Sequence, residues 1–307
     1  MSKYILRRIL ISMPVLLGLT VIVFAMVHLL PGDPAQVMLA QSGASPEAIA
    51  KLRSQLGLDL PLPVQYANYM RDLVHGDLGS SLFTYRPVAE IIRQNAGATL
   101  ELALSAILLA IMVGVLLGVL AAVFRDSWID HLAMTVAVVG VSMPGFWLAL
   151  LLILLFSVRL GLLPSGGQGT FKQLILPASV LGFNSAAVIA RLVRSSMLEV
   201  LNQEYIMTAR SKGLGEARVV LRHAFRNALI PVITVAGLQF GFLLGGTVVT
   251  ETVFARQGLG RVAVDSILYK DFPVVQGIVL FVAVIYMLVN LLVDICYMVI
   301  DPRIRWQ

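Results

Sequence analysis

The sequence predicts an all-α membrane protein that crosses the bilayer about six times, and three observations support this. Of its 307 residues, 58% are hydrophobic and 13% are charged, whereas soluble domains carry about 25% charged residues. The mean hydropathy is +0.88. Apolar runs of about 20 residues, long enough to cross a bilayer as helices, alternate with shorter polar intervals.

The first apolar run predicts a retained membrane helix. It extends from Ile9 to Leu30 and follows the basic residues Lys3, Arg7 and Arg8. A signal peptide has an apolar region of only about 7–15 residues, followed by a cleavage site of small residues. Because basic residues stay on the cytoplasmic side, we expect residues 1–30 to be an inside tail and the first span. Arg303 and Arg305 place the C-terminus on the same side.

Residues 31–97 are predicted to form a small helical subdomain on the outer side. A helix begins at Ser45-Pro46-Glu47, because these residues supply an N-cap, a proline at the first helical position and an acid in the first turn. Two more short helices are expected, one over Val64–Val74 and one that opens at Arg86-Pro87.

Two aspartates of this region occupy turn sequences. Asp33 lies in LPGDP and Asp77 lies in GDLG. Aspartate commonly caps a turn by accepting hydrogen bonds from nearby backbone N–H groups. The turn interpretation is therefore preferred to a paired metal or substrate site.

Five more spans are predicted within residues 98–307, which are expected to form a five-helix core. They cover 99–124, 131–158, 174–195, 228–249 and 274–300. The first of these contains Gly114 and Gly118, whose four-residue spacing lets helices approach closely. The next contains Pro144-Gly145, which predicts a kink.

The polar interval from Glu204 to Pro231 is predicted to be a cytoplasmic loop. Gly213 ends its first helix, because glycine accepts the left-handed conformation that terminates helices. A second short helix is expected after Gly215. The basic residues of the interval are Arg210, Lys212, Arg218, Arg222 and Arg226.

The same interval carries a motif. Its sequence EYIMTARSKGLGEARVVLRHAFRNALIP resembles the "EAA" coupling loop of ABC importer permeases, in the form found in the dipeptide, oligopeptide, nickel and glutathione permease family. Ala209 and Gly213 keep the spacing of the motif, and Met207 and Thr208 occupy the positions of its Glu and first Ala. Further segments resemble this family: LPGDP, QLGLD, GDLG, RPV, GLGR and NLLVD.

The resemblance implies that the chain is the first permease chain of a pair, with its coupling loop at residues 198–228. In that family the loop is a short helix that sits in a cleft of an ATP-hydrolysing subunit. The coupling residues implied are Glu204, Met207, Thr208, Ala209 and Gly213.

The resemblance also implies the partners and the location. They are a second homologous permease chain, two ATP-binding subunits and an extracytoplasmic substrate-binding protein, in a bacterial plasma (inner) membrane. No cofactor is expected on this chain, since ATP and Mg²⁺ are used by the ATP-binding subunits. The expected cargo is a di- or oligopeptide, or a glutathione-like peptide. Contact with the binding protein is expected from Asp33, Asp77 and Arg261.

No catalytic motif accompanies these features. The sequence contains neither a G-x-x-x-x-G-K-[ST] phosphate loop nor an H-E-x-x-H or G-x-S-x-G motif. Cys296 is its single cysteine, which excludes a disulfide within the chain. The net charge of +6 is explained by cytoplasmic loops, and no nucleic-acid partner is expected. We therefore do not expect an enzyme.

Three polar residues within predicted spans are candidates for the translocation pathway: Gln239, Asn290 and Asp294. An ionisable residue at membrane depth indicates function, because burying it costs at least about 2.5 kcal/mol. A structural alternative is that Asp294 forms a hydrogen bond or ion pair with Arg191 or Arg194.

Two other functions stay open at this point. One is an ion- or proton-coupled secondary transporter that uses Asp294 as its coupling acid. The other is a membrane-embedded assembly factor, in which glycine-rich helix faces serve only packing. ATP depletion separates the first from an ABC importer, and an absence of any uptake defect would indicate the second.

Overall fold

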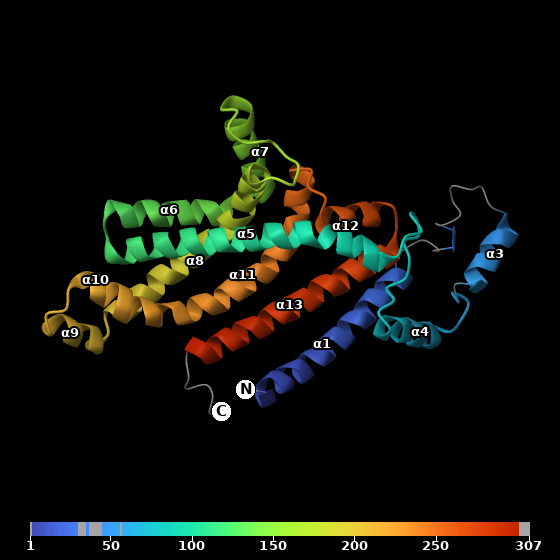
Figure 1. The fold of residues 1–307 in the computed structure, drawn as a ribbon, viewed down its shortest axis with the longest axis horizontal. Helices are drawn as coiled ribbons and strands as arrows, with labels where there is room; N and C mark the ends of the chain where they lie inside the picture. The colour runs from blue at the N-terminus through green and yellow to red at the C-terminus, as the bar shows by residue number, and fades with distance from the viewer. Residues whose placement is uncertain (1, 30–34, 37–44, 56, 301–307) are drawn as a thin grey trace. The chain divides into compact units, whose positions relative to one another are not determined.

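The computed structural model describes residues 2–29, 35–36, 45–55 and 57–300. These residues are mostly helical, with an isolated β-bridge between Ser80 and Pro87. Figure 1 shows the order of the helices, from α1 (Ser2–Leu29) to α13 (Phe272–Ile300). The predicted all-α class is confirmed.

The chain divides into two compact units. The first comprises residues 1–97 and 258–287, and the second comprises residues 98–257 and 288–307. This division rests on packing. The predicted functional division, with residues 31–97 as an outer subdomain, is a separate statement and stays a prediction.

In the first unit, two of the three predicted short helices are present as separate helices. α3 (Pro46–Gln55) begins where the Ser45 hydroxyl accepts the N–H of Ala48 at 3.4 Å. The next helix, α4 (Leu62–Val74), has proline in its first turn. α12 (Leu259–Leu268) follows in the later part of the chain.

The start of α5 (Val88–Val123) corrects one prediction. The short helix expected after Arg86-Pro87 and the span expected from Thr99 are a single helix of 36 residues. Its first turns are held by a buried cluster, because apolar residues recur every four positions on one face. The cluster contains Val88, Ile92, Ala96, Leu259, Val274 and Ile278.

A buried aspartate joins distant segments of the first unit. Asp271 is 4% exposed and accepts hydrogen bonds from the Ser81 hydroxyl and from the backbone N–H of Leu82, the latter at 2.9 Å. The turn before α5 is thereby fixed to the start of α13. Beside it, the rings of Phe83 and Tyr269 stack with centroids 4.9 Å apart.

The second unit is built around α8 (Phe171–Leu201). Its N-terminus has a capping box in which Thr170 and Gln173 bond to each other's backbone N–H groups. Pro177 lies inside this helix without ending it. α8 packs against α6 (Trp128–Ser142), α7 (Gly145–Leu152) and α11 (Phe225–Val253).

Glycines set the close approach of α5 to α8. A Cβ placed on Gly118 would lie 2.6 Å from the carbonyl oxygen of Ala190 and 2.6 Å from the Cβ of Val193. Gly114 meets Ala186 in the same way, at 2.7 Å from its carbonyl oxygen. The two glycines therefore pack against α8, as their spacing predicts.

Among the described residues, four helical segments are long and apolar enough to cross a membrane, and they lie in α5, α8, the continuous helix Glu216–Val253 and α13. A fifth span results if α6 and the segment Gly145–Arg159 are counted together, although these two are bent by 111°. The corresponding apolar stretch of α1 is shorter, Leu10–Met26. Six spans with both termini inside therefore stay a prediction.

Candidate functional site

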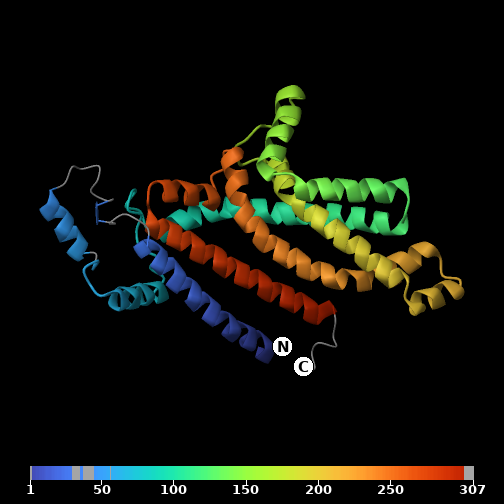
Figure 2. The same cartoon turned by 180° about the vertical axis from the view of Figure 1, so that it is seen from behind.

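The candidate coupling segment begins with α9 (Glu204–Ser211), and Figure 2 shows it beyond the ends of α8 and α11. Gly213 has φ +75°, the left-handed conformation that glycine adopts readily. Its N–H donates to the carbonyl of Arg210 at 2.9 Å, and the N–H of Leu214 donates to that of Ala209 at 3.4 Å. The helix stop predicted at Gly213 is confirmed.

α9 has one buried and one exposed face. Ile206 is 0% exposed and Ala209 is 8% exposed, and both belong to a core that includes Met197 of α8 and Val219 and Ala224 of the following helix. The other predicted coupling residues are exposed: Glu204, Met207, Thr208 and Gly213. The structure thus separates one inward-facing member of the predicted set, Ala209, from four outward-facing ones.

An ion pair bridges the glycine turn. The guanidinium of Arg210 donates to Glu216 from Nε at 3.1 Å and from a terminal nitrogen at 2.5 Å. Hydrogen bonding to this carboxylate raises the pKa of Arg210. Because Arg210 is in α9 and Glu216 begins α10 (Glu216–Arg218), the pair ties the two helices together across Gly213.

A second connection lies on the opposite end of α9. The Nδ2 of Asn227 donates to the hydroxyl of Tyr205 at 2.8 Å, and that hydroxyl donates to the carbonyl of His223 at 3.5 Å. Sequence reasoning singled out neither tether. The sequence feature that could have predicted the ion pair is the placement of Arg210 and Glu216, which have opposite charges and flank Gly213 and Gly215.

The segment after the turn corrects a second prediction. We expected a second short helix, but α10 continues through the π-helix η2 (Val219–Ala224) into α11. The result is one helix from Glu216 to Val253, 38 residues long. Arg218, Arg222 and Arg226 lie along its start, and all three are exposed.

The predicted translocation residues are dispersed in the second unit. Gln239 accepts a hydrogen bond from the Ser185 hydroxyl of α8 at 3.2 Å. Asn290 and Asp294 are partly buried on α13. A Cβ on Gly237 would lie 2.4 Å from Val293, so α11 and α13 approach closely beside Asp294.

Arg194 was one proposed partner of Asp294. In the structure, Arg194 instead forms an ion pair with Asp130. The Nε and a terminal nitrogen of Arg194 donate to the two oxygens of Asp130, each at 2.6 Å. Asp130 is 2% exposed and also accepts the backbone N–H of Asp126 at 3.1 Å. This pair joins α6 to α8.

Two of the residues expected to contact a binding protein, Asp77 and Arg261, belong to the first unit. Asp77 accepts the backbone N–H of Gly79 at 2.8 Å, which is the turn-capping role preferred from the sequence. Arg261 is exposed on α12. Asp33 lies outside the described residues.

Two buried charged residues were not singled out from the sequence. Glu251, which follows the span predicted over 228–249, is 0% exposed in α11, and the Thr99 hydroxyl donates to it at 2.7 Å. Arg256 is 1% exposed and donates to Glu101 at 2.9 Å. The Thr99–Glu251 pair connects α5 to the end of α11, and the Glu101–Arg256 pair connects α5 to the segment that follows α11. Neither pair could be read from the sequence, because each depends on how these segments pack.

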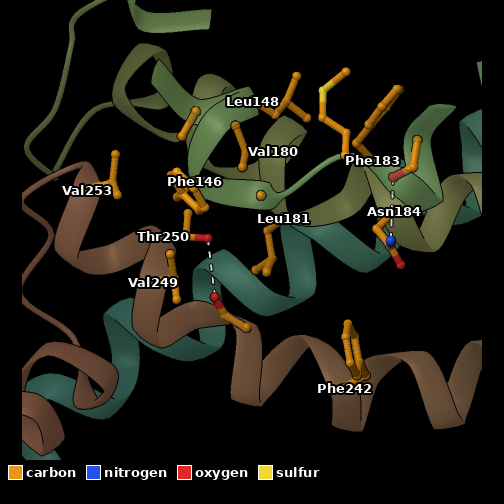
Figure 3. Close-up of a pocket in the computed structure, with 15 residues that line it drawn as sticks. Phe146, Leu148, Val180, Leu181, Phe183, Asn184, Phe242, Val249, Thr250 and Val253 are labelled. Atoms are coloured by element: carbon orange, nitrogen blue, oxygen red, sulfur yellow. Dashed lines mark hydrogen bonds between the residues drawn. The ribbon is translucent and has the colours of Figure 1, made fainter. Parts of the chain in front are cut away.

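A cavity of about 270 Å³ lies between α6, α7, α8 and α11 in the second unit. Figure 3 shows its apolar walls, among them Phe146, Val180 and Val249, and the amide of Asn184 at one edge. The cavity is at the break between α6 and α7.

Solved structures share this helical fold. A chain of the MetNI methionine ABC transporter, solved in inward-facing conformations, matches with a TM-score of 0.60 over 69% of this chain and 97% of its own, at 19% identity. A chain of an amino acid ABC transporter crystallised with histidines matches with a TM-score of 0.51 over 68% of this chain and 94% of its own, at 20% identity.

The chain belongs to the family described as binding-protein-dependent transport system inner membrane component, whose profile matches residues 114–306. The N-terminal profile of the same transport systems matches residues 1–103. The dipeptide transport system permease protein DppB of Alkalihalophilus pseudofirmus is 46% identical, and the glutathione transport system permease protein GsiC of Salmonella typhimurium is 47% identical. Both alignments cover 100% of each chain.

The family settles the class of protein. The chain is a multi-pass inner-membrane permease of an ABC transport system, and the named relatives are permease components. This result does not favour a secondary transporter that uses Asp294.

Proposed function

We propose that this chain is one of two permease chains in an ATP-driven peptide importer, and that α9 docks on an ATP-hydrolysing partner subunit. The proposed assembly also contains a second homologous permease, a second ATP-binding subunit and an extracytoplasmic substrate-binding protein. ATP and Mg²⁺ are used by the ATP-binding subunits. The peptide cargo is inferred from the names of relatives that transport dipeptides and glutathione.

The observation that carries the docking proposal is the two-faced construction of α9. Its exposed residues Glu204, Met207 and Thr208 face outward, while Ile206 and Ala209 are buried behind them. A helix packed against the core moves together with it when pushed, whereas a loop without such packing would deform. We assign contact with the ATPase to the exposed residues and support of the helix to Ala209.

We further propose that movement of α9 is transmitted to the membrane helices through two side-chain contacts. The Arg210–Glu216 pair and the Tyr205–Asn227 bond fasten α9 to the continuous helix Glu216–Val253. A displacement of α9 by the partner subunit therefore moves this helix. Transport requires that the bound nucleotide favour one of two conformations of the permease pair over the other.

The remaining predicted residues fit the same scheme. Gln239, Asn290 and Asp294 are proposed to line the translocation pathway between the two permease chains. Asp77 and Arg261, together with Asp33, are proposed to face the substrate-binding protein.

Substitution of Gly213 tests the docking proposal. Valine at φ +75° is strained by about 1–2 kcal/mol, and a Cβ there meets nothing within 4 Å, so the change acts through the backbone. We expect Gly213→Val to lower peptide uptake per ATP hydrolysed in the reconstituted complex. Gly213→Asn is the control, because asparagine tolerates this conformation. Unchanged uptake in the valine variant would count against docking through α9.

The partners are tested by gentle affinity purification of the chain from its native membranes, followed by mass spectrometry. Two ATP-binding subunits and a second permease in stoichiometric amounts are expected. Recovery of the chain alone, or with itself only, would contradict the importer.

A further inference from the structure

The span predicted over residues 131–158 is broken at Pro144. α6 ends at Ser142 and α7 starts at Gly145, with Met143 and Pro144 in extended conformations at ψ 125° and 130°. Proline has no N–H, so the carbonyl of Gly140 loses the donor it would have in a continuous helix. At membrane depth, non-helical backbone is tolerated only where it is buried in protein or lines a cavity.

The cavity described above is located at this break. Its walls come from α7, α8 and α11, and they include Phe146, Val180, Phe183, Val249 and Val253 (Figure 3). Ligand pockets have volumes of about 300–1,000 Å³, and this one has about 270 Å³. It therefore has room for one side chain with its adjoining peptide group, and is too small for a long peptide.

One edge of the cavity is polar. The Nδ2 of Asn184 donates to the carbonyls of both Gly140 and Val141, each at 3.5 Å. These distances are at the outer limit of hydrogen bonding, so a single amide satisfies two acceptors weakly. Of these two residues, Gly140 lines the cavity, and its carbonyl can accept a better-placed N–H donor from a ligand. A peptide supplies such donors from its amides or its terminal ammonium group.

The lining distinguishes among possible occupants. None of the described residues that line the cavity is charged, and none is histidine or cysteine, which disfavours a metal ion or a charged side chain. An acyl chain of a lipid would match the apolar walls, but it has no donor for the carbonyls of the break. An apolar side chain on a peptide backbone matches both the apolar walls and the polar edge of the cavity.

We propose that this cavity is a subsite for an apolar side chain of the transported peptide, with Asn184 and the carbonyl of Gly140 next to the peptide backbone. The proposal rests on the peptide importer proposed above and names the part of its cargo that this chain recognises. It predicts a selectivity for side-chain size that is a property of this permease in addition to that of the binding protein.

The test compares two dipeptides, alanyl-alanine and phenylalanyl-phenylalanine, in proteoliposomes that contain the full complex and its binding protein. Val249→Phe fills the cavity and Val249→Ala enlarges it. Excluding a side chain from an apolar pocket changes discrimination by about 10–200-fold. We expect Val249→Phe to lower the ratio of phenylalanyl to alanyl dipeptide uptake by about tenfold or more, and Val249→Ala to leave that ratio equal or higher.

The matched control is Leu238→Phe. Leu238 lies on the same helix, is 53% exposed as against 49% for Val249, and is not part of the cavity lining. It should leave the ratio unchanged. An equal ratio in Val249→Phe and wild type would overturn the subsite. Failure of the wild-type complex to take up either dipeptide would instead overturn the peptide importer itself.

Thiol labelling provides a readout that is independent of transport. In a Cys296→Ser background, which removes the single native cysteine, Val249→Cys and Leu238→Cys are labelled with a maleimide. Phenylalanyl-phenylalanine should slow labelling at position 249 and leave position 238 unchanged. If position 249 is unreactive both with and without the dipeptide, another chain or a lipid occupies the cavity and the proposal is wrong.

Discussion

Arg194 of α8 holds Asp130 of α6 through two parallel hydrogen bonds, each 2.6 Å long. The carboxylate is 2% exposed on its side chain and the guanidinium is 26% exposed. Bidentate geometry of this kind gives both strength and a defined orientation. Since α8 leads directly toward α9, the pair fixes the helix that supports the candidate coupling segment.

Removing the charge of Asp130 should destabilise the protein. Breaking a buried ion pair from one side costs about 3–5 kcal/mol, and the partial exposure of Arg194 suggests about 3 kcal/mol for Asp130→Asn. The measurement is thermal unfolding of the purified chain in detergent. The exposed Arg125–Asp126 pair, at 57% and 75% exposure, is the control, and Arg125→Gln should change stability by less than about 1 kcal/mol. Equal effects of the two changes would contradict the assigned role.

The Arg210–Glu216 pair should matter for coupling and little for stability. Its side chains are 42% and 58% exposed, and exposed pairs contribute at most about 1 kcal/mol. We expect Arg210→Glu and Glu216→Arg each to reduce the uptake of peptide per ATP in the reconstituted complex. The double exchange restores the bridge and should restore the ratio. A double variant as impaired as the single ones would indicate that these residues contact the partner subunit directly.

The Glu101–Arg256 pair should respond asymmetrically to mutation. Glu101 has a side chain that is 56% exposed, whereas that of Arg256 is 1% exposed, and the Nε of Arg256 has no hydrogen-bond partner among the described residues. Glu101→Ala leaves a buried charge without its carboxylate and should cost about 3 kcal/mol. Arg256→Met leaves a carboxylate that water can reach and should cost less.

A double-mutant cycle checks this asymmetry. The melting temperature of Glu101→Ala/Arg256→Met should be higher than that of Glu101→Ala, because the stranded charge is gone. A double variant less stable than both single variants would refute the explanation.

Because of Tyr69, we expect the stability of the folded protein to fall at alkaline pH. Burial raises the pKa of its hydroxyl to about 12, and that hydroxyl has no hydrogen-bond partner among the described residues. In an unfolded chain tyrosine ionises near about pH 10. The folded state therefore keeps its proton while the unfolded state loses it, so stability is complete below about pH 10 and falls as the pH rises toward about 12.

Tyr69→Phe should remove this contribution to the pH dependence. Unfolding midpoints measured from about pH 9 to about pH 11 should decline less steeply in the phenylalanine variant than in the wild type. At neutral pH the variant should be at least as stable, because an unsatisfied buried hydroxyl is removed. Identical slopes for the two proteins would contradict the assignment.

The sequence predicted the features that depend on local chemistry. The helix start at Ser45 and the helix stop at Gly213 follow from capping and from the backbone freedom of glycine, and both are present. The turn role of Asp77 was predicted for the same reason. The apolar runs likewise predicted the four long apolar helices found among the described residues, since length and composition alone decide them.

Features that depend on packing were not predicted. α5 continues through Thr99 because its first turns are buried against distant residues of the first unit. The 111° bend at Pro144 exceeds the kink expected there. The partner of Arg194 and the burial of Glu251 depend on which helices become neighbours, and no local pattern encodes that choice.

In the proposed mechanism, the continuous helix from Glu216 to Val253 acts as a lever. At 1.5 Å per residue, its 38 residues extend over roughly 57 Å. Pivoting such a rod by about 5° about one end carries the other end through roughly 5 Å, about one helical turn. If α9 is displaced as proposed, a small tilt near α9 would therefore produce a larger displacement at Val253.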